Sequence, residues 1–217
     1  MSAPRGLLLD FGSVISVSVF ERHRDTEAIL GLRAGCLSWH GPIAPETDAL
    51  WQAMQRDEIT EREYWARRAA ELGTAVGEPG WDVQTMLLRV RQTDPAAVVR
   101  PEMRQLITAA RTRGIRLGIL SNELELFYGA EFLRRMGMLE QFDVVVDATH
   151  TGVLKPDPRS YAQAVDRMRL AAGDILFVDD QFRNIAGAAK AGMQTQHFEL
   201  RDIAGSFAAI RARLRLD

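Results

Sequence analysis

Residues 174–180 read DILFVDD, a run of four apolar side chains that stops at two aspartates. The same pattern occurs in GLLLD at residues 6–10, IRLGILS at residues 115–121 and FDVVVD at residues 142–147, with a weaker version in residues 193–198. Short, nearly continuous apolar runs separated by helical segments are typical of strands buried on both faces of a parallel sheet. The sequence therefore predicts an α/β fold with five parallel strands.

The segments between these runs carry helix signals. Pro101 suits a first helical turn, Gly114 suits the position just after a helix end, and an apolar stripe at helical spacing fills residues 203–214. Strand and helix patterns thus alternate over residues 97–217. This alternation predicts a layered, Rossmann-like core with a parallel sheet.

Residues 15–95 carry a different pattern. No convincing buried strand occurs there, whereas Thr60 and Glu63 form a capping-box pattern ahead of an apolar helical repeat. All four tryptophans of the chain fall in this segment, where a helical bundle would bury them. We therefore expect an inserted α-helical cap domain over residues 15–95 and a core domain made of residues 1–14 and 96–217.

The composition of the chain argues against several classes of protein. Its single cysteine, Cys36, rules out an intramolecular disulfide and favours a reducing, cytoplasmic setting. With a net charge of −2, the chain lacks the overall positive charge that is typical of proteins that bind nucleic acid. No apolar stretch approaches the roughly 20 residues that a membrane helix needs. The first residues also lack the pattern of a signal peptide. We expect a cytoplasmic protein whose partner is a small molecule, with no nucleic acid or membrane involved.

Polar side chains follow the predicted strands at the points where the strands end. Asp10, Ser121, and Asp179 with Asp180 come directly after apolar runs, and Lys155 lies in the loop after the third long run. Because the carboxyl ends of parallel strands share one edge of a sheet, we expect these groups to converge there. Three neighbouring carboxylates repel one another unless a cation lies among them, and oxygen ligands of this kind suit Mg²⁺. The sequence thus predicts a magnesium site at this edge.

The same edge offers groups that bind an anion. Lys155 and the Ser121-Asn122 pair at a helix start are suited to hold a phosphate beside the metal. Lys155 is one of only two lysines among 27 basic residues, which suggests that a compact ammonium is required there. Taken singly, each polar residue is also typical of a helix cap or a solvated loop. Together, at four strand ends, they favour phosphoryl chemistry on an aspartate.

Four short motifs carry a resemblance to a known family. They are LLDFGSV at residues 8–14, ILSN at residues 119–122, KPD at residues 155–157 and FVDD at residues 177–180. Their order and spacing resemble the haloacid dehalogenase-like (HAD) hydrolase superfamily over nearly the whole chain. The helical insertion is similar to the family's C1 cap, and residues 57–65 resemble caps found near sugar phosphatases and the phosphatase domain of soluble epoxide hydrolase.

This resemblance implies a two-step hydrolysis of a small phosphorylated molecule. Asp10 would attack the phosphorus and form an aspartyl phosphate, which water then cleaves. The resemblance places Mg²⁺ on the Asp10 carboxylate, the Gly12 backbone carbonyl and Asp180. Asp179 would act on the metal site through water or by orienting Lys155.

The resemblance also implies how the substrate phosphate is held. Ser121 and the Asn122 amide would bind phosphate oxygens, and Lys155 would offset charge on the nucleophile and the phosphate. A phosphate brings about −2 charge to a site that is already acidic. The metal and the lysine are therefore expected to be needed before substrate can approach Asp10.

One position departs from the family pattern. Most phosphatases of the superfamily carry a second aspartate two residues after the nucleophile, as general acid and base, and here that position is Gly12. Glu21, His23 and Glu123 are candidates for a substitute acid, but nothing in the sequence marks one of them. We therefore expect substrates whose leaving group needs no proton, such as aryl and acyl phosphates.

Two other functions fit parts of the sequence. A 2-haloacid dehalogenase also uses an aspartate nucleophile and needs no acid, but without a metal the paired Asp179 and Asp180 would repel its anionic substrate. Gly12 also fits a catalytically weak protein that binds a phospho-ligand or regulates a partner. A response-regulator receiver domain is disfavoured, because there the acidic pair follows the first strand and the lysine comes last.

Overall fold

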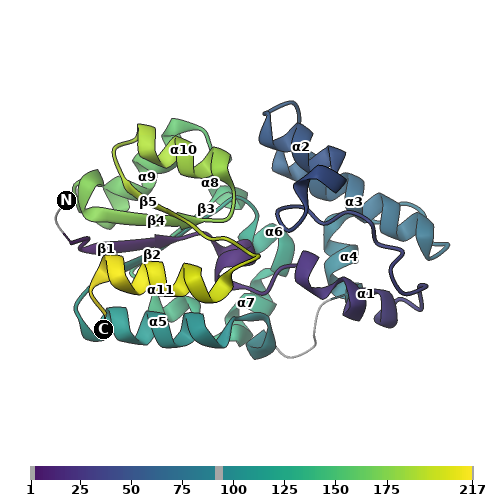
Figure 1. The fold of residues 1–217 in the computed structure, drawn as a ribbon, viewed down its shortest axis with the longest axis horizontal. Helices are drawn as coiled ribbons and strands as arrows, with labels where there is room; N and C mark the ends of the chain where they lie inside the picture. Colours follow the sequence, from purple (N-terminus) through teal and green to yellow (C-terminus); the bar gives the residue numbers. More distant parts are fainter. Residues whose placement is uncertain (1–2, 91–94, 217) are drawn as a thin grey trace.

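A parallel sheet of five strands lies at the centre of the molecule. The structure is a computed structural model that describes residues 3–90 and 95–216. The strand order is β3-β2-β1-β4-β5, and all neighbouring pairs are parallel (Figure 1). The strands are β1 (Gly6–Leu9), β2 (Arg116–Ser121), β3 (Val144–Asp147), β4 (Ile175–Asp179) and β5 (Gln194–His197). The predicted α/β class is confirmed, and each strand falls within one of the five apolar runs.

Seven helices of the described residues belong to this α/β part. They are α5 (Pro101–Thr112), α6 (Leu124–Tyr128), α7 (Ala130–Met136), α8 (Ala148–Thr151), α9 (Pro158–Met168), α10 (Phe182–Lys190) and α11 (Ile203–Leu214). Side chains alternate between the two faces along each strand. Leu7 and Leu9 accordingly pack with apolar residues of α5, α7 and α11, whereas Leu8 packs with those of α9 and α10. Figure 1 shows these helices in two layers, one on each face of the sheet.

The segment after β1 forms a separate helical bundle. Its helices are α1 (His23–Ile29), α2 (Ala49–Gln55), α3 (Glu61–Ala75) and α4 (Val83–Val90). The Phe20 ring lies 5.4–5.8 Å from the rings of Trp39, Trp51 and Trp65, so aromatic residues build the core of the bundle. The predicted capping box is present, because the Thr60 side chain accepts from the Glu63 N–H and the Glu63 side chain accepts from the Thr60 N–H.

Short helical turns link these elements. They lie at Phe11–Ile15, Phe20–Arg22, Pro45–Thr47, Pro95–Val98, Leu139–Gln141 and Ala172–Asp174. In the described ranges, no helix combines the length and the apolarity that a membrane span requires.

Two chain segments connect the bundle with the α/β part and run side by side. Ser16 and Val99 form an isolated antiparallel bridge, the Val17 N–H donates to the Val98 carbonyl at 2.9 Å, and the Arg100 N–H donates to the Ile15 carbonyl at 3.0 Å. We propose that these segments join a core domain to a cap domain, with the division expected from the sequence. Residues 91–94, which belong to the predicted cap, lie outside the described residues.

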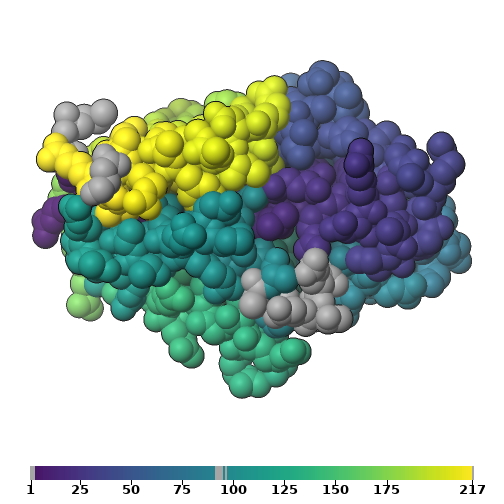
Figure 2. Space-filling view, turned by 60° about the horizontal axis from the view of Figure 1, so that its bottom comes forward, coloured from purple at the N-terminus to yellow at the C-terminus, as the bar shows by residue number. Residues whose placement is uncertain are grey.

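The bundle covers the end of the sheet that carries the strand carboxyl ends. In Figure 1 the beginning of β1 and the end of α11 lie at the opposite end of the molecule from the bundle. In the space-filling view of Figure 2, the bundle in purple and blue packs directly against core segments in yellow and teal. The strand ends that were predicted to carry the site therefore face a second layer of protein.

A buried ion pair inside the bundle gives a test of its packing. The Asp48 carboxylate accepts from Tyr64 Oη at 2.8 Å and pairs with Arg68, and the side chains of Asp48 and Arg68 are 0% and 8% exposed. Removal of one partner of a buried ion pair costs about 3–5 kcal/mol. We expect Asp48→Ala to lower the free energy of unfolding by about that amount in a urea titration. Glu71→Ala, which removes the half-exposed partner of the same arginine, should cost less than about 1 kcal/mol, and equal costs would contradict this packing.

Candidate active site

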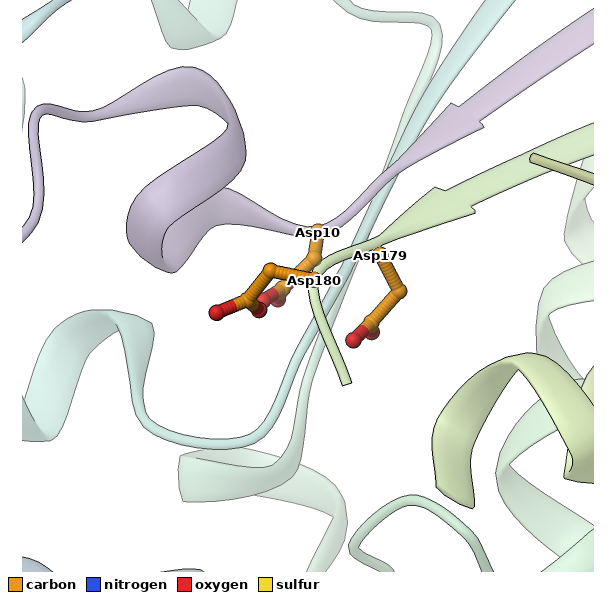
Figure 3. Close-up of side chains that lie close together, drawn as sticks. All are labelled: Asp10, Asp179 and Asp180. Atoms are coloured by element: carbon orange, nitrogen blue, oxygen red, sulfur yellow. The ribbon is translucent and has the colours of Figure 1, made fainter. Parts of the chain in front are cut away.

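Three carboxylates converge at the carboxyl edge of the sheet, as the sequence predicted. Asp10 follows β1 directly, Asp179 is the last residue of β4, and Asp180 comes next in the chain. One oxygen atom from each of them lies within 4.8 Å of one from each of the others, and all three residues are buried. In Figure 3 the carboxylates of Asp10 and Asp180 point to the same side of the strand ends, and that of Asp179 lies apart from them, below the end of its own strand.

Lys155 lies among these carboxylates. The Lys155 Nζ atom is 2.8 Å from Asp10 Oδ1 and 2.6 Å from Asp179 Oδ2, and the side chain is only 1% exposed. A loop after β3 brings the lysine to this point, because β3 is parallel to the strands that carry the aspartates. The structure therefore brings Lys155 together with the three aspartates, as expected.

The surroundings of Asp179 fit a positioning role. Asp179 Oδ1 accepts from the Gln181 N–H at 2.8 Å, and Asn184 Nδ2 lies 3.1 Å from both Asp179 oxygens. The Lys155 Nζ atom also donates a hydrogen bond to Asp179 Oδ2. Both oxygens are thus engaged by the protein itself, so the geometry favours Asp179 as the group that holds Lys155. Of the two roles that the resemblance allowed for Asp179, orientation of the lysine is the one the contacts support.

The site carries more negative than positive charge. Burial raises the pKa of Asp10 to about 7, although the neighbouring Lys155 opposes this rise. Burial, together with the charges of Asp179 and Asp10, also raises the pKa of Asp180 well above its usual range. Burial alone would favour neutral Lys155, but the nearby carboxylates raise its pKa and keep it charged. One ammonium cannot balance three carboxylates, so an oxygen-ligated cation such as Mg²⁺ fits this donor set.

The pair Ser121-Asn122 lies beside the lysine loop. Ser121 is the last residue of β2, and both residues are buried. The Asn122 side chain accepts from the Lys155 N–H at 2.6 Å and donates to the Lys155 carbonyl at 3.2 Å, so it holds the lysine loop in place. Binding of phosphate oxygens by Ser121 and Asn122 stays a prediction, and the engaged Asn122 side chain favours its backbone N–H for that role.

Gly12 lies in the turn that follows Asp10. Its φ of −61° and ψ of 134° are open to any amino acid. A Cβ atom built at this position would have one heavy atom within 4 Å, Asp10 Oδ2 at 4.0 Å. Packing therefore does not exclude a Cβ atom at this position. Coordination of a metal by the Gly12 carbonyl stays a prediction.

The three acids suggested by the sequence are engaged elsewhere. Glu21 pairs with Arg100 near the two connecting segments. Burial alone would raise the pKa of Glu21, but hydrogen bonds with Arg100 and Ser18 lower it. Burial lowers the pKa of His23 to about 4, and its ring lies against Trp39 inside the bundle. Burial also raises the pKa of Glu123 to about 7, but its carboxylate pairs with Arg62 at 2.9 Å. In the described part of the chain, none of the three hydrogen-bonds to the three aspartates.

Sequence reasoning missed one acid that does reach the site. Glu61 is the first residue of α3, and its Oε2 accepts from Asn122 Nδ2 at 2.7 Å. The capping box placed the helix start correctly, but no local pattern shows that this end of the helix points at the core. The resemblance of residues 57–65 to known caps was the available signal.

Comparison with known proteins places the chain in a family. The model of the haloacid dehalogenase-like hydrolase family matches residues 6–192, so the chain belongs to this family and is a hydrolase by class. It is 31% identical over 126 residues to a phosphoglycolate phosphatase from Nitrosospira multiformis, a match that covers 55% of each chain. It is 27% identical over 164 residues to (S)-2-haloacid dehalogenase 1 from a Pseudomonas species, covering 71% of each chain.

The matched regions are partial for the first curated relatives. They span 9%, 43% and 55% of the lengths of three such proteins. Among solved structures, the HAD hydrolase YfnB from Bacillus subtilis, bound to magnesium, is similar with a TM-score of 0.68 and 19% identity. That match covers 89% of this chain and 86% of YfnB, and it supports the Rossmann-like fold.

Proposed function

We propose that this protein is a Mg²⁺-dependent phosphatase that hydrolyses a small phosphate monoester through an aspartyl phosphate on Asp10. The observation that carries this proposal is the cluster of three buried carboxylates around one buried lysine at the carboxyl edge of the sheet. A family relative named as a phosphoglycolate phosphatase supports the choice of a phosphate ester as substrate.

The residues have distinct roles in this reaction. An Asp10 oxygen attacks phosphorus, while Ser121 and the Asn122 backbone N–H bind the phosphate oxygens. Lys155 lies 2.8 Å from Asp10 and offsets the charge that builds up as the anionic phosphate approaches. Two unit charges about 4 Å apart interact with about 4 kcal/mol at an effective dielectric constant near 20, so one ammonium matters for both binding and rate. Water then attacks the phosphorus of the aspartyl phosphate and frees Asp10.

The carboxylates of Asp10 and Asp180 and the Gly12 carbonyl are the proposed metal ligands. They suit Mg²⁺, which prefers oxygen donors. When bound, the ion supplies positive charge that offsets the repulsion between the carboxylates and the phosphate. Asp179 fixes Lys155 beside this group of ligands.

Removal of the metal is the first test of this function. The purified protein is screened against a panel of phosphate monoesters, which includes 4-nitrophenyl phosphate, in excess EDTA and after addition of Mg²⁺. We expect turnover to vanish in EDTA and to return with Mg²⁺, because the uncompensated carboxylates repel the substrate. Undiminished phosphatase activity in EDTA would contradict the proposal.

The dehalogenase named among the relatives makes 2-haloacid hydrolysis the second candidate. Its anionic substrates would meet three carboxylates and one lysine in this site. This charge balance favours the phosphatase. Halide release from a 2-haloacid in EDTA, without phosphate release from any ester, would reverse the order of the two candidates.

A further inference from the structure

The proposed phosphatase lacks a proton donor at the position where its family usually has one. Departure of an alkoxide from phosphorus is assisted by a general acid, which contributes typically about 10²- to 10⁴-fold. Gly12 has no side chain, and beyond its chain neighbours only Asp10 Oδ2 lies within 4 Å of a Cβ atom built there. A donor in the helical bundle, which faces the strand ends, would extend the substrates from the aryl and acyl phosphates expected from the sequence to alkyl phosphates.

Glu61 is the bundle carboxyl group that contacts the site. Its Oε2 lies 2.7 Å from Asn122 Nδ2, and Asn122 is the neighbour of Ser121 and holds the Lys155 loop. The charge of Glu61 also contributes to the raised pKa values of Asp10 and Asp180. The carboxyl group thus lies within electrostatic reach of the proposed nucleophile, next to the residues proposed to bind the phosphate.

The segment that carries Glu61 is fixed to the core on both sides. Before it in the chain, Asp57 pairs with Arg183 Nη1 at 2.8 Å, and the Arg183 side chain is 8% exposed. After it, Arg62 Nε pairs with Glu123 Oε1 at 2.9 Å. Ion pairs between the bundle and the α/β part thus flank Glu61 in the sequence, one before it and one after it. They hold Glu61 beside Asn122, so its position does not depend on the contact with Asn122 alone.

Glu61 is also chemically available, unlike its neighbours. Glu63 is taken up by the capping box, Glu58 pairs with Arg56, and Glu123 pairs with Arg62. Within the described residues, Glu61 forms no ion pair, and its Oε2 contact with Asn122 leaves Oε1 for another partner. A carboxyl group that is held in place but has no direct ion-pair partner is suited to carry a proton to and from a substrate.

We propose that Glu61 is the general acid and base of this site, an inference that rests on the proposed phosphatase function. As Asp10 forms its bond to phosphorus, the bond from phosphorus to the leaving oxygen breaks, and that oxygen takes the proton of the Glu61 carboxyl group. In the second half, the Glu61 carboxylate takes a proton from the water that attacks phosphorus, and Asp10 departs as a carboxylate. Glu61 is then protonated and Asp10 is ionised, as they were before the reaction. With this proton donor, alkyl phosphates become substrates alongside aryl phosphates.

A comparison of leaving groups tests this role. The kcat/KM of wild type, Glu61→Gln and the control Glu58→Gln is measured with saturating Mg²⁺ on 4-nitrophenyl phosphate and on the best alkyl phosphate of the panel, because kcat/KM reports the steps up to loss of the leaving group and leaves out the later attack of water. Nitrophenolate leaves without a proton, whereas an alkoxide needs one. We expect Glu61→Gln to lower kcat/KM on the alkyl ester by about 10²- to 10⁴-fold and on the aryl ester by less than about threefold. Glu58→Gln removes an exposed carboxylate three residues before Glu61 and should match wild type on both esters.

The outcomes separate this inference from the proposed function. Equal losses on both esters would show that Glu61 only supports the structure or the electrostatics of the site, and unchanged rates would show that it has no role; either result overturns the inference. Wild type that cleaves aryl esters alone would also overturn it. Failure of the proposed function looks different, because wild type would then show no Mg²⁺-dependent turnover of 4-nitrophenyl phosphate at all.

Discussion

Asp10→Asn is expected to lower kcat on 4-nitrophenyl phosphate by on the order of 10⁴-fold or more while the fold is retained. The substitution keeps the shape of the side chain but removes the nucleophile and one proposed metal ligand. Losses of this size are typical when a catalytic nucleophile is removed. Lys155 would still pair with Asp179, so the buried ammonium keeps a charged partner.

Steady-state kinetics and thermal unfolding together check this expectation. Asp25→Asn is a matched control, because Asp25 is 61% exposed and pairs with Arg22 on the bundle surface. The control should retain the wild-type kcat. An Asp10→Asn protein that keeps a tenth or more of the wild-type kcat would refute the assignment of the nucleophile.

Lys155→Arg is expected to be far from conservative. The ammonium is 1% exposed and lies 2.8 Å and 2.6 Å from two carboxylates, with the Phe177 ring 5.6 Å away. A planar guanidinium has a different reach and more atoms, so it must displace at least one of these groups. A misplacement of about 1 Å in a reacting site can cost about 10²-fold, and we expect a loss of roughly that size in kcat/KM.

The chain offers a matched control for this substitution. Lys190, the only other lysine, lies exposed at the end of α10, so Lys190→Arg should behave as wild type. If Lys155→Arg is nearly as active as wild type, the positive charge is needed but the compact ammonium is not. The rarity of lysine in this arginine-rich chain would then have no functional meaning.

The sequence was most informative where local pattern and topology coincide. Continuous apolar runs identify buried parallel strands, and parallel strands bring the residues after them to one edge. Asp10, Ser121 and Asp179 could therefore be placed together without any knowledge of side-chain contacts. The Lys155 loop follows the same rule, because it lies after a strand that is parallel to the others.

The proton donor could not be found in this way, because it depends on contacts between distant parts of the chain. Glu61 and Asn122 are 61 residues apart, and Glu21 meets Arg100 across 79 residues. No spacing within a helix shows which of its ends faces the core. Asp179 gives a second example, since the sequence marked it as acidic but only the contacts with Asn184 and Gln181 reveal how it is oriented.

Chemical trapping of the phosphorylated enzyme decides whether Asp10 carries the reaction. Wild type is mixed with substrate and Mg²⁺, quenched during turnover and treated with borohydride, which reduces an aspartyl phosphate to homoserine. Mass spectrometry of the digested protein should find homoserine at Asp10, and Asp10→Asn treated in parallel should show none. Turnover of the phosphate ester with Asp10 unmodified, or with homoserine at another aspartate, would contradict covalent catalysis through Asp10.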